Sequence, residues 1–153
     1  MQEIEVKVDN DHIERLTTAK PILALSELIW NAYDADARTV RVEFEEGGLT
    51  KPGLIRVQDD GNGIPFEEAE GYFKSLGGLM EEKGGEDQRW PLYSRRKGQG
   101  RFKAFSLGET VTWISSANGK RFSIAGQISN LKTFKVSDVF PTASIGCTVD
   151  RAT

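Results

Sequence analysis

The side chains best suited to chemistry gather in two short stretches of the chain. In the first, Glu27, Asn31 and Asp34 are spaced so that a carboxylate, an amide and a second carboxylate share one face of a helix. The second is the acidic and glycine-rich run from Asp59 to Gly63, which follows a short apolar segment. Together the two stretches predict a nucleotide pocket that requires a metal ion.

Each residue type suggests a different part of this chemistry. Asp59 could accept a hydrogen bond from the exocyclic amine of adenine, whereas guanine has a carbonyl there. Gly61 and Gly63 would let the backbone come close to the base. An amide oxygen from Asn31, together with phosphate oxygens, would suit magnesium, which prefers oxygen ligands and keeps several waters. Glu27 is placed to polarise a water toward the terminal phosphate.

A third stretch could hold the phosphates. Gly98-Gln99-Gly100 leads into a segment predicted to be helical, whose first amides and dipole would attract phosphate, with Lys97, Arg101 and Lys103 adding positive charge. The long glycine-rich and charged segment 77–98 is a candidate lid. Taken singly, these stretches are also typical of a solvated helix face, an ordinary turn and a loop before a helix. Their occurrence together and in this order favours the nucleotide site.

Hydrophobic periodicity predicts the elements that must position these residues. A helix should begin at Pro21 and bury an apolar stripe that includes Ile22 and Leu28. We also expect Trp30 and, further on, Trp113 in the core. Pro65 should open a second helix that continues to residue 75 or 76. Asn118-Gly119 indicates a hairpin turn. Further segments are an edge strand over 3–8, a helix over 11–16, and strands over 39–45, 54–58, 110–115, 121–125, 131–136 and 147–150.

Length and composition favour one compact domain over residues 1–153. The chain has 38% hydrophobic residues and a formal charge of −3, so its overall charge does not indicate a nucleic-acid or membrane surface. Its one cysteine, Cys147, excludes an internal disulfide and fits a reducing compartment. The apolar segments are far shorter than a membrane span, and the acidic start lacks the basic region of a signal peptide. We therefore expect a cytoplasmic protein.

At these motifs the chain resembles the GHKL superfamily of ATPases, which groups DNA gyrase, large heat-shock chaperones, sensor histidine kinases and MutL proteins. The stretch from Glu27 to Ala35 is similar to the N-box, and that from Asp59 to Gly63 to the D-x-G-x-G motif. The stretch 98–108 resembles the glycine-rich lid motif, and Gly146-Cys147-Thr148 resembles the final G-T element with an inserted cysteine. The stretch 75–78 and the string 97–108 look more like a loosely defined set of bacterial GHKL ATPases than like any of these four groups.

The resemblance implies a Bergerat fold, an α/β two-layer sandwich whose mixed, mostly antiparallel sheet has helices on one face, with an ATP lid. It implies that Glu27 is the general base, Asn31 the magnesium ligand and Asp59 the adenine contact. Asp34 would support the site. The other implied ATP-binding residues are Gly61, Gly63, Ile64, Lys97, Gly98, Gln99, Gly100, Arg101, Phe102 and Thr148.

The resemblance also implies an activity. Sensor kinases generally have another residue at the position of Glu27, so this residue favours hydrolysis, as in the gyrase, chaperone and MutL branches. The leading expectation is magnesium-dependent ATP binding with slow hydrolysis and a role as a conformational switch. In several branches a second domain supplies a lysine, and activity depends on homodimer closure. We therefore expect the N-terminal domain of a longer protein whose downstream domain is missing. The alternatives are histidine-kinase-like phosphotransfer and a nucleotide-binding regulatory module without hydrolysis.

Overall fold

The computed structural model describes residues 2–8, 18–48, 53–76, 100–137, 140–141 and 146–152. Several predictions therefore lie outside the described residues. They are the helix over 11–16, the candidate lid over 77–98, and the phosphate contacts of Lys97, Gly98 and Gln99.

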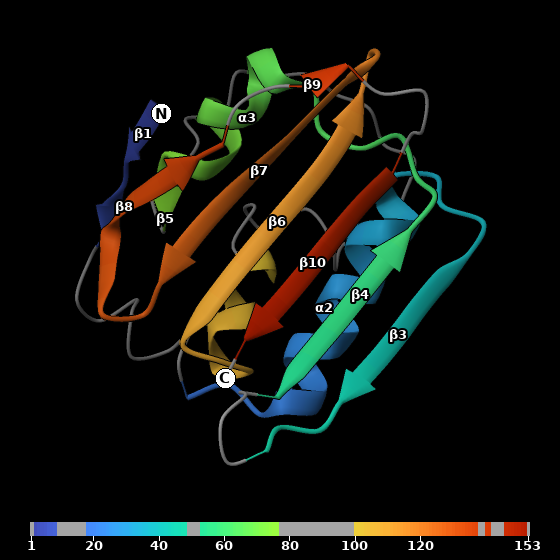
Figure 1. Cartoon of the computed structure of the whole chain (residues 1–153), viewed down its shortest axis with the longest axis vertical. Helices are drawn as coiled ribbons and strands as arrows, with labels where there is room; N and C mark the ends of the chain where they lie inside the picture. Colours follow the sequence, from blue (N-terminus) through green and yellow to red (C-terminus); the bar gives the residue numbers. More distant parts are fainter. Residues whose placement is uncertain are drawn as a thin grey trace, which may run out of the picture.

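One antiparallel sheet crosses the molecule (Figure 1). Its neighbouring strands run antiparallel throughout, and β9 (Phe140–Pro141) pairs with β7 beside the main order. A separate parallel pair joins β2 (Lys7–Val8) to β5 (Ser75–Leu76). The strand order is β1 (Gln2–Glu5), β8 (Asn130–Val136), β7 (Lys120–Gln127), β6 (Thr110–Ala117), β10 (Gly146–Ala152), β4 (Leu54–Asp59) and β3 (Val40–Glu45).

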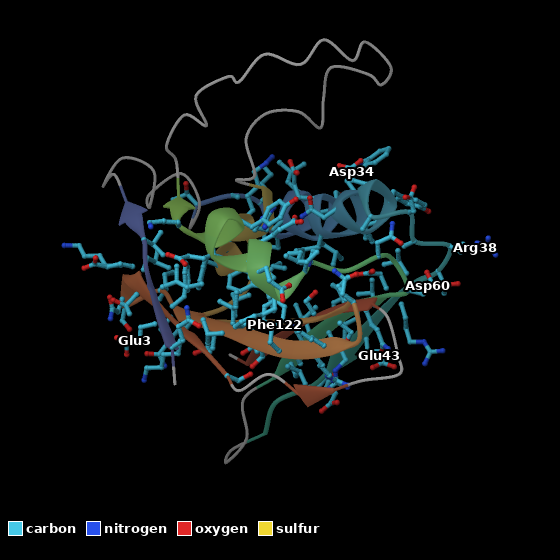
Figure 2. The ribbon with its side chains drawn as sticks, turned by 90° about the horizontal axis from the view of Figure 1, so that it is seen from above. Glu3, Asp34, Arg38, Glu43, Asp60 and Phe122 are labelled. Carbon is cyan, nitrogen blue, oxygen red and sulfur yellow. The ribbon has the colours of Figure 1, made fainter. Side chains whose placement is uncertain are left out.

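The helical elements form a second layer on one face of this sheet. They are α2 (Pro21–Asp34), α3 (Phe66–Phe73) and the 3-10 helix η1 (Gly100–Ser106). Figure 2, seen from above, shows α2 and α3 on the same side of the strands. This arrangement confirms the predicted α/β two-layer sandwich with a mostly antiparallel sheet; the described parallel pairing lies in the separate β2–β5 pair. Within the part of the chain that the structure describes, no helix is long and apolar enough to cross a membrane.

An aromatic cluster joins the two layers. The ring centroids of Phe73 on α3 and Trp113 on β6 are 5.1 Å apart. The rings of Phe102 on η1 and Phe134 on β8 are nearly parallel, with centroids 5.9 Å apart. These four side chains are at most 4% exposed, which confirms the prediction for Trp113. Gly126 belongs to this contact, because a Cβ there would lie 2.0 Å from the Phe134 ring. The cluster fixes both η1 and β6 under the pocket described below.

Most predicted strands are confirmed, with longer ends in the structure. The stretch 3–8 divides into β1, which lies at the sheet edge against β8 as predicted, and β2. Asn118 and Gly119 both have positive φ, 52° and 72°, as a two-residue hairpin turn between β6 and β7 requires.

Two predictions about the helices are wrong. The helix that follows Pro65 ends at Phe73, because residues 75–76 pair with β2 instead of continuing the helix. Trp30 is 62% exposed rather than buried, and Ile22 from the expected stripe is 65% exposed. The helix α2 buries Leu28 together with small alanines at i−4 and i+4, and Trp30 lies about 200° around the helix from Leu28, on the solvent side.

Candidate functional site

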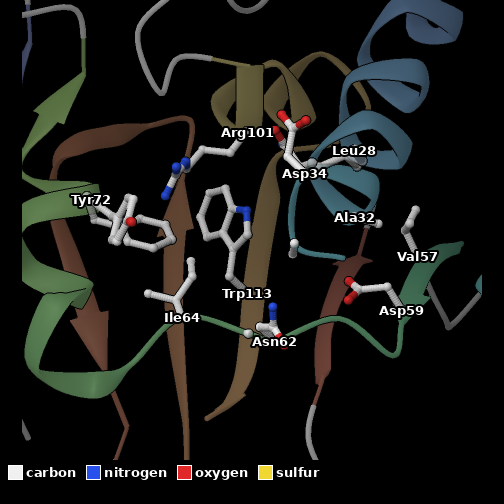
Figure 3. Close-up of a pocket in the computed structure, with 14 residues that line it drawn as sticks. Leu28, Ala32, Asp34, Val57, Asp59, Asn62, Ile64, Tyr72, Arg101 and Trp113 are labelled. Carbon is white, nitrogen blue, oxygen red and sulfur yellow. The ribbon is translucent and has the colours of Figure 1, made fainter. Parts of the chain in front are cut away.

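A pocket of about 410 Å³ opens between α2, α3 and the loop that follows β4 (Figure 3). This volume is in the range of small-molecule sites, and the lining combines apolar side chains with a few polar ones, as such sites do. The lining residues are Leu28, Asn31, Ala32, Asp34, Ala35, Val57, Asp59, Asn62, Gly63, Ile64, Tyr72, Phe73, Arg101 and Trp113.

The helix α2 contributes the predicted amide and carboxylate. Asn31 and Asp34 both line the pocket and are exposed. Glu27 lies one turn before Asn31 and is not among the lining residues. Its Oε1 instead accepts a hydrogen bond from Nζ of Lys103 on η1, at 2.6 Å. The structure thus places Asn31 and Asp34 in the pocket and Glu27 beside it.

Asp59 is the last residue of β4 and also lines the pocket. Figure 3 shows its carboxylate turned toward the pocket interior. The backbone N–H of Gly61 donates to its Oδ1 at 2.8 Å, which holds the carboxylate in this orientation. The acceptor predicted for a base amine is therefore pre-positioned by the loop that follows it.

The two glycines of this loop also allow close packing against neighbouring backbone. A Cβ at Gly61 would lie 2.7 Å from the carbonyl oxygen of Ala35, and one at Gly63 would lie 2.4 Å from that of Ser116. Gly63 also has a φ of +68°, which disfavours other residues. The expectation that these glycines let the backbone approach the base stays a prediction, and the contacts show a packing role beside it. The glycines let the loop pack tightly on α2 and β6.

Asp60, the neighbour of Asp59, anchors the outside of the same loop. Its Oδ1 accepts the backbone N–H groups of Arg38 at 2.8 Å and Thr39 at 2.9 Å. These bonds, with that of Thr39 the larger cause, lower the pKa of the Asp60 carboxyl. Figure 2 shows Asp60 beside Arg38 at the periphery of the molecule. Of two adjacent acids, one therefore faces the pocket and the other clamps the loop.

Sequence reasoning missed a buried hydroxyl that fixes the end of this loop. The N–H of Ile64 donates to Oγ of Ser115 at 2.7 Å, and the same hydroxyl donates to the carbonyl of Ile64 at 3.0 Å. Ser115 on β6 is only 2% exposed. The available signal was a pair of serines inside a strand that is otherwise mostly apolar, which indicates a polar group with a buried partner.

Arg101 places a cation at the pocket. Its guanidinium carbon lies 4.9 Å from the ring centroid of Tyr72 and 5.4 Å from that of Phe73, within the range of cation–π contacts. Figure 3 shows the Arg101 side chain extending toward Tyr72 above Trp113. Tyr72 and Trp113 are pocket residues that the sequence reasoning did not assign to the site.

The remaining predicted residues surround the pocket less directly. Phe102 is fully buried in the aromatic cluster and does not line the pocket. Gly100 begins η1, which is a 3-10 helix of seven residues. Thr148 on β10 pairs with Gln58, the residue before Asp59, so its backbone lies beside the end of β4.

Comparison with known proteins agrees with this architecture. A family described as "Histidine kinase-, DNA gyrase B-, and HSP90-like ATPase" matches residues 19–147. The chain is 40% identical over 73 residues to the DNA mismatch repair protein MutL of Halalkalibacterium halodurans, which covers 44% of this chain and 11% of that protein. It is 58% identical over 45 residues to MutL of Thermus aquaticus, covering 29% of this chain and 8% of that protein.

These alignments span about a tenth of the length of the relatives. The family match, in contrast, extends over most of the chain, from the start of α2 into β10. It includes every element that lines the pocket. At the level of the family, this match supports ATP binding and hydrolysis. The chain therefore belongs to the histidine kinase-, DNA gyrase B- and HSP90-like ATPases, that is, to the GHKL superfamily.

Proposed function

We propose that this domain binds ATP with magnesium in the pocket between α2 and β4, hydrolyses it slowly, and acts as a conformational switch. The observation that carries the proposal is that Asp59, at the end of β4, lines the same pocket as Asn31 and Asp34 from α2 and Arg101 from η1. This arrangement separates a hydrogen-bond acceptor for the base from the groups that suit a metal ion and phosphates.

Adenine recognition centres on Asp59. The Gly61 N–H donates to one carboxylate oxygen of Asp59. The carboxylate is turned toward the pocket interior, where we propose that it accepts a hydrogen bond from the adenine amine. The apolar side chains of Leu28, Val57 and Ile64 provide surfaces for the purine ring. An acid at this position favours adenine over guanine, which has no amine there.

In this proposal the metal and the phosphates bind where α2 and η1 line the pocket. Asn31 and Asp34 offer hard oxygen donors at the pocket, which fits magnesium, since this ion takes few protein ligands and completes its shell with water and phosphate oxygens. When bound, magnesium neutralises phosphate charge. Arg101 adds a cation held in place by two aromatic rings. Backbone groups and loop residues expected to assist are Gly61, Gly63, Lys97, Gly98, Gln99, Gly100, Phe102 and Thr148.

Glu27 is the proposed general base. It lies at i−4 from Asn31, so a water between it and the terminal phosphate would be near the metal. We expect slow turnover by the domain alone, with faster turnover after homodimer closure and contact with a downstream domain. In this proposal ATP, not nucleic acid or membrane, is the ligand of the domain.

Calorimetric titration tests binding, and single-turnover cleavage tests hydrolysis. ATP should bind more tightly with magnesium than without it, and more tightly than GTP. Glu27→Ala should keep binding and lose cleavage. Absence of ATP binding in either condition would refute the proposal, equal cleavage rates in the two proteins would refute the role of Glu27, and binding without cleavage in both would favour the regulatory module.

A further inference from the structure

An ion pair connects the proposed general base to the 3-10 helix η1. The Nζ of Lys103 lies 2.6 Å from Oε1 of Glu27, and the two residues are 76 positions apart in the chain. Their side chains are 34% and 38% exposed, so the pair is partly shielded from water. By comparison, the Lys74–Glu70 pair lies at the C-terminal end of α3, and both of its side chains are more than half exposed.

Both partners are held by buried neighbours. Lys103 lies between Phe102 and Ala104, which are 0% and 2% exposed and belong to the hydrophobic core. Glu27 precedes Leu28, which is 6% exposed and packs in the same core. Because both backbones are fixed in this way, less side-chain entropy is lost in forming the pair than for two long side chains on loops. The packing of the core therefore specifies this contact.

Neither Glu27 nor Lys103 lines the pocket, but each has a near neighbour in the chain that does. Leu28, directly after Glu27, lines the pocket, and so does Arg101, two residues before Lys103. The two elements that carry the pair are thus the ones that approach the proposed phosphate end. A lysine ammonium has three donors on a flexible stem, so it can contact a carboxylate and a phosphate at the same time.

A cation between Glu27 and the terminal phosphate would reduce an electrostatic repulsion in the proposed function. A carboxylate that activates water must lie near a terminal phosphate that is itself negative, and the two repel each other at this range. A positive charge between them offsets the repulsion and forms charge-assisted hydrogen bonds to both. Lys103 contacts the Glu27 carboxylate in the structure.

We propose that Lys103 is a terminal-phosphate ligand supplied by this domain itself, an inference that rests on the proposed function. In the structure its ammonium is held by Glu27. With ATP bound, the ammonium contacts the terminal phosphate and keeps Glu27 beside it. ADP has no terminal phosphate at this position, so Lys103 distinguishes ATP from ADP.

The test compares the affinities for ADP and for a non-hydrolysable ATP analogue with an imido bridge, both with magnesium. Lys103→Met should weaken binding of the ATP analogue about tenfold and that of ADP less than about twofold. Lys103→Arg keeps the charge and should retain most of the preference. The matched control is Lys120→Met, which removes another lysine that pairs with a glutamate across two elements, Glu67 on α3, and should change neither affinity.

The outcomes separate the two proposals. If wild type binds the ATP analogue and Lys103→Met has an unchanged preference for it over ADP, Lys103 has only a structural role and this inference is wrong. An equal loss for both nucleotides would overturn it in the same way. If wild type binds neither nucleotide, the proposed function itself fails. Should Lys103→Met not fold, as judged by circular dichroism, Lys103→Gln is measured against the same criterion.

Discussion

Replacing Asp59 by asparagine should weaken ATP binding about ten- to a hundredfold and leave the fold nearly intact. The contact at risk is a charge-assisted hydrogen bond from the adenine amine, and losing such a bond costs about 1.5–3 kcal/mol. Asparagine places either a weaker neutral oxygen or an NH₂ donor against that amine. The loss should therefore appear in the binding of the base.

The stability of the fold should change little, because the internal bond of Asp59 can be kept. Its Oδ1 accepts the Gly61 N–H at 2.8 Å, and the amide oxygen of asparagine can accept the same bond. We expect a free energy of unfolding within about 1 kcal/mol of wild type. The ATP preference over GTP should also fall, since an asparagine amide can donate to the guanine carbonyl.

Asp60→Asn is the matched control for this experiment. It changes the adjacent residue in the same way, but Asp60 accepts backbone N–H groups outside the pocket and is not among the lining residues. Calorimetric titration with ATP and GTP, together with urea denaturation, measures all three proteins. If Asp59→Asn binds ATP as tightly as wild type, or if Asp60→Asn loses as much affinity, the assignment of base recognition to Asp59 is refuted.

Three further predictions concern the fold that holds the pocket. Phe73→Ala should lower the free energy of unfolding by about 3–5 kcal/mol because Phe73 is 1% exposed within the aromatic cluster, whereas Phe44→Ala, at a residue 67% exposed, should change it by less than about 0.5 kcal/mol in urea denaturation. Gly63→Ala should lower the free energy of unfolding by at least about 2 kcal/mol, because it adds a 2.4 Å contact with backbone to an unfavourable φ. Gly119→Ala has a similar φ but open space around it, and should lower the free energy of unfolding by about 1 kcal/mol. Equal effects would show that the φ alone matters. The pKa of Asp60 is lowered in the folded state, so its stabilising contribution is present above its usual pKa of about 4 and is lost as the pH falls through the lower folded value. The difference in free energy of unfolding between wild type and Asp60→Asn, measured by denaturation from about pH 2.5 to about pH 7, should therefore shrink toward acid. A difference that stays constant over this range would contradict the assignment.

Local patterns were enough to predict much of the fold. Alternating residues identified the strands, and Asn118-Gly119 identified the hairpin because few other residues tolerate positive φ at both positions. The placement of Asp59 at a strand end followed from the apolar run before it. These features depend on near neighbours in the chain, which is why the sequence alone contains them.

Long-range packing decided what these patterns could not. Trp30 was expected in the core, but α2 packs its small residues against the sheet and leaves Trp30 exposed. The end of α3 depended on a partner strand far away in the sequence. In both cases the local preference was compatible with more than one arrangement, and burial against other elements selected one.

The sequence by itself determined which residues could form a nucleotide site and which family the motifs resemble, because residue type and spacing set the available chemistry. Only the tertiary structure decided that Asp59 faces the pocket while Asp60 clamps the loop, since two adjacent acids have the same chemistry. It also brought Lys103 to Glu27 across 76 residues, a contact that depends on how the core packs α2 against η1. Chemistry is local to the residue, whereas the direction in which a side chain points depends on the packing of distant segments.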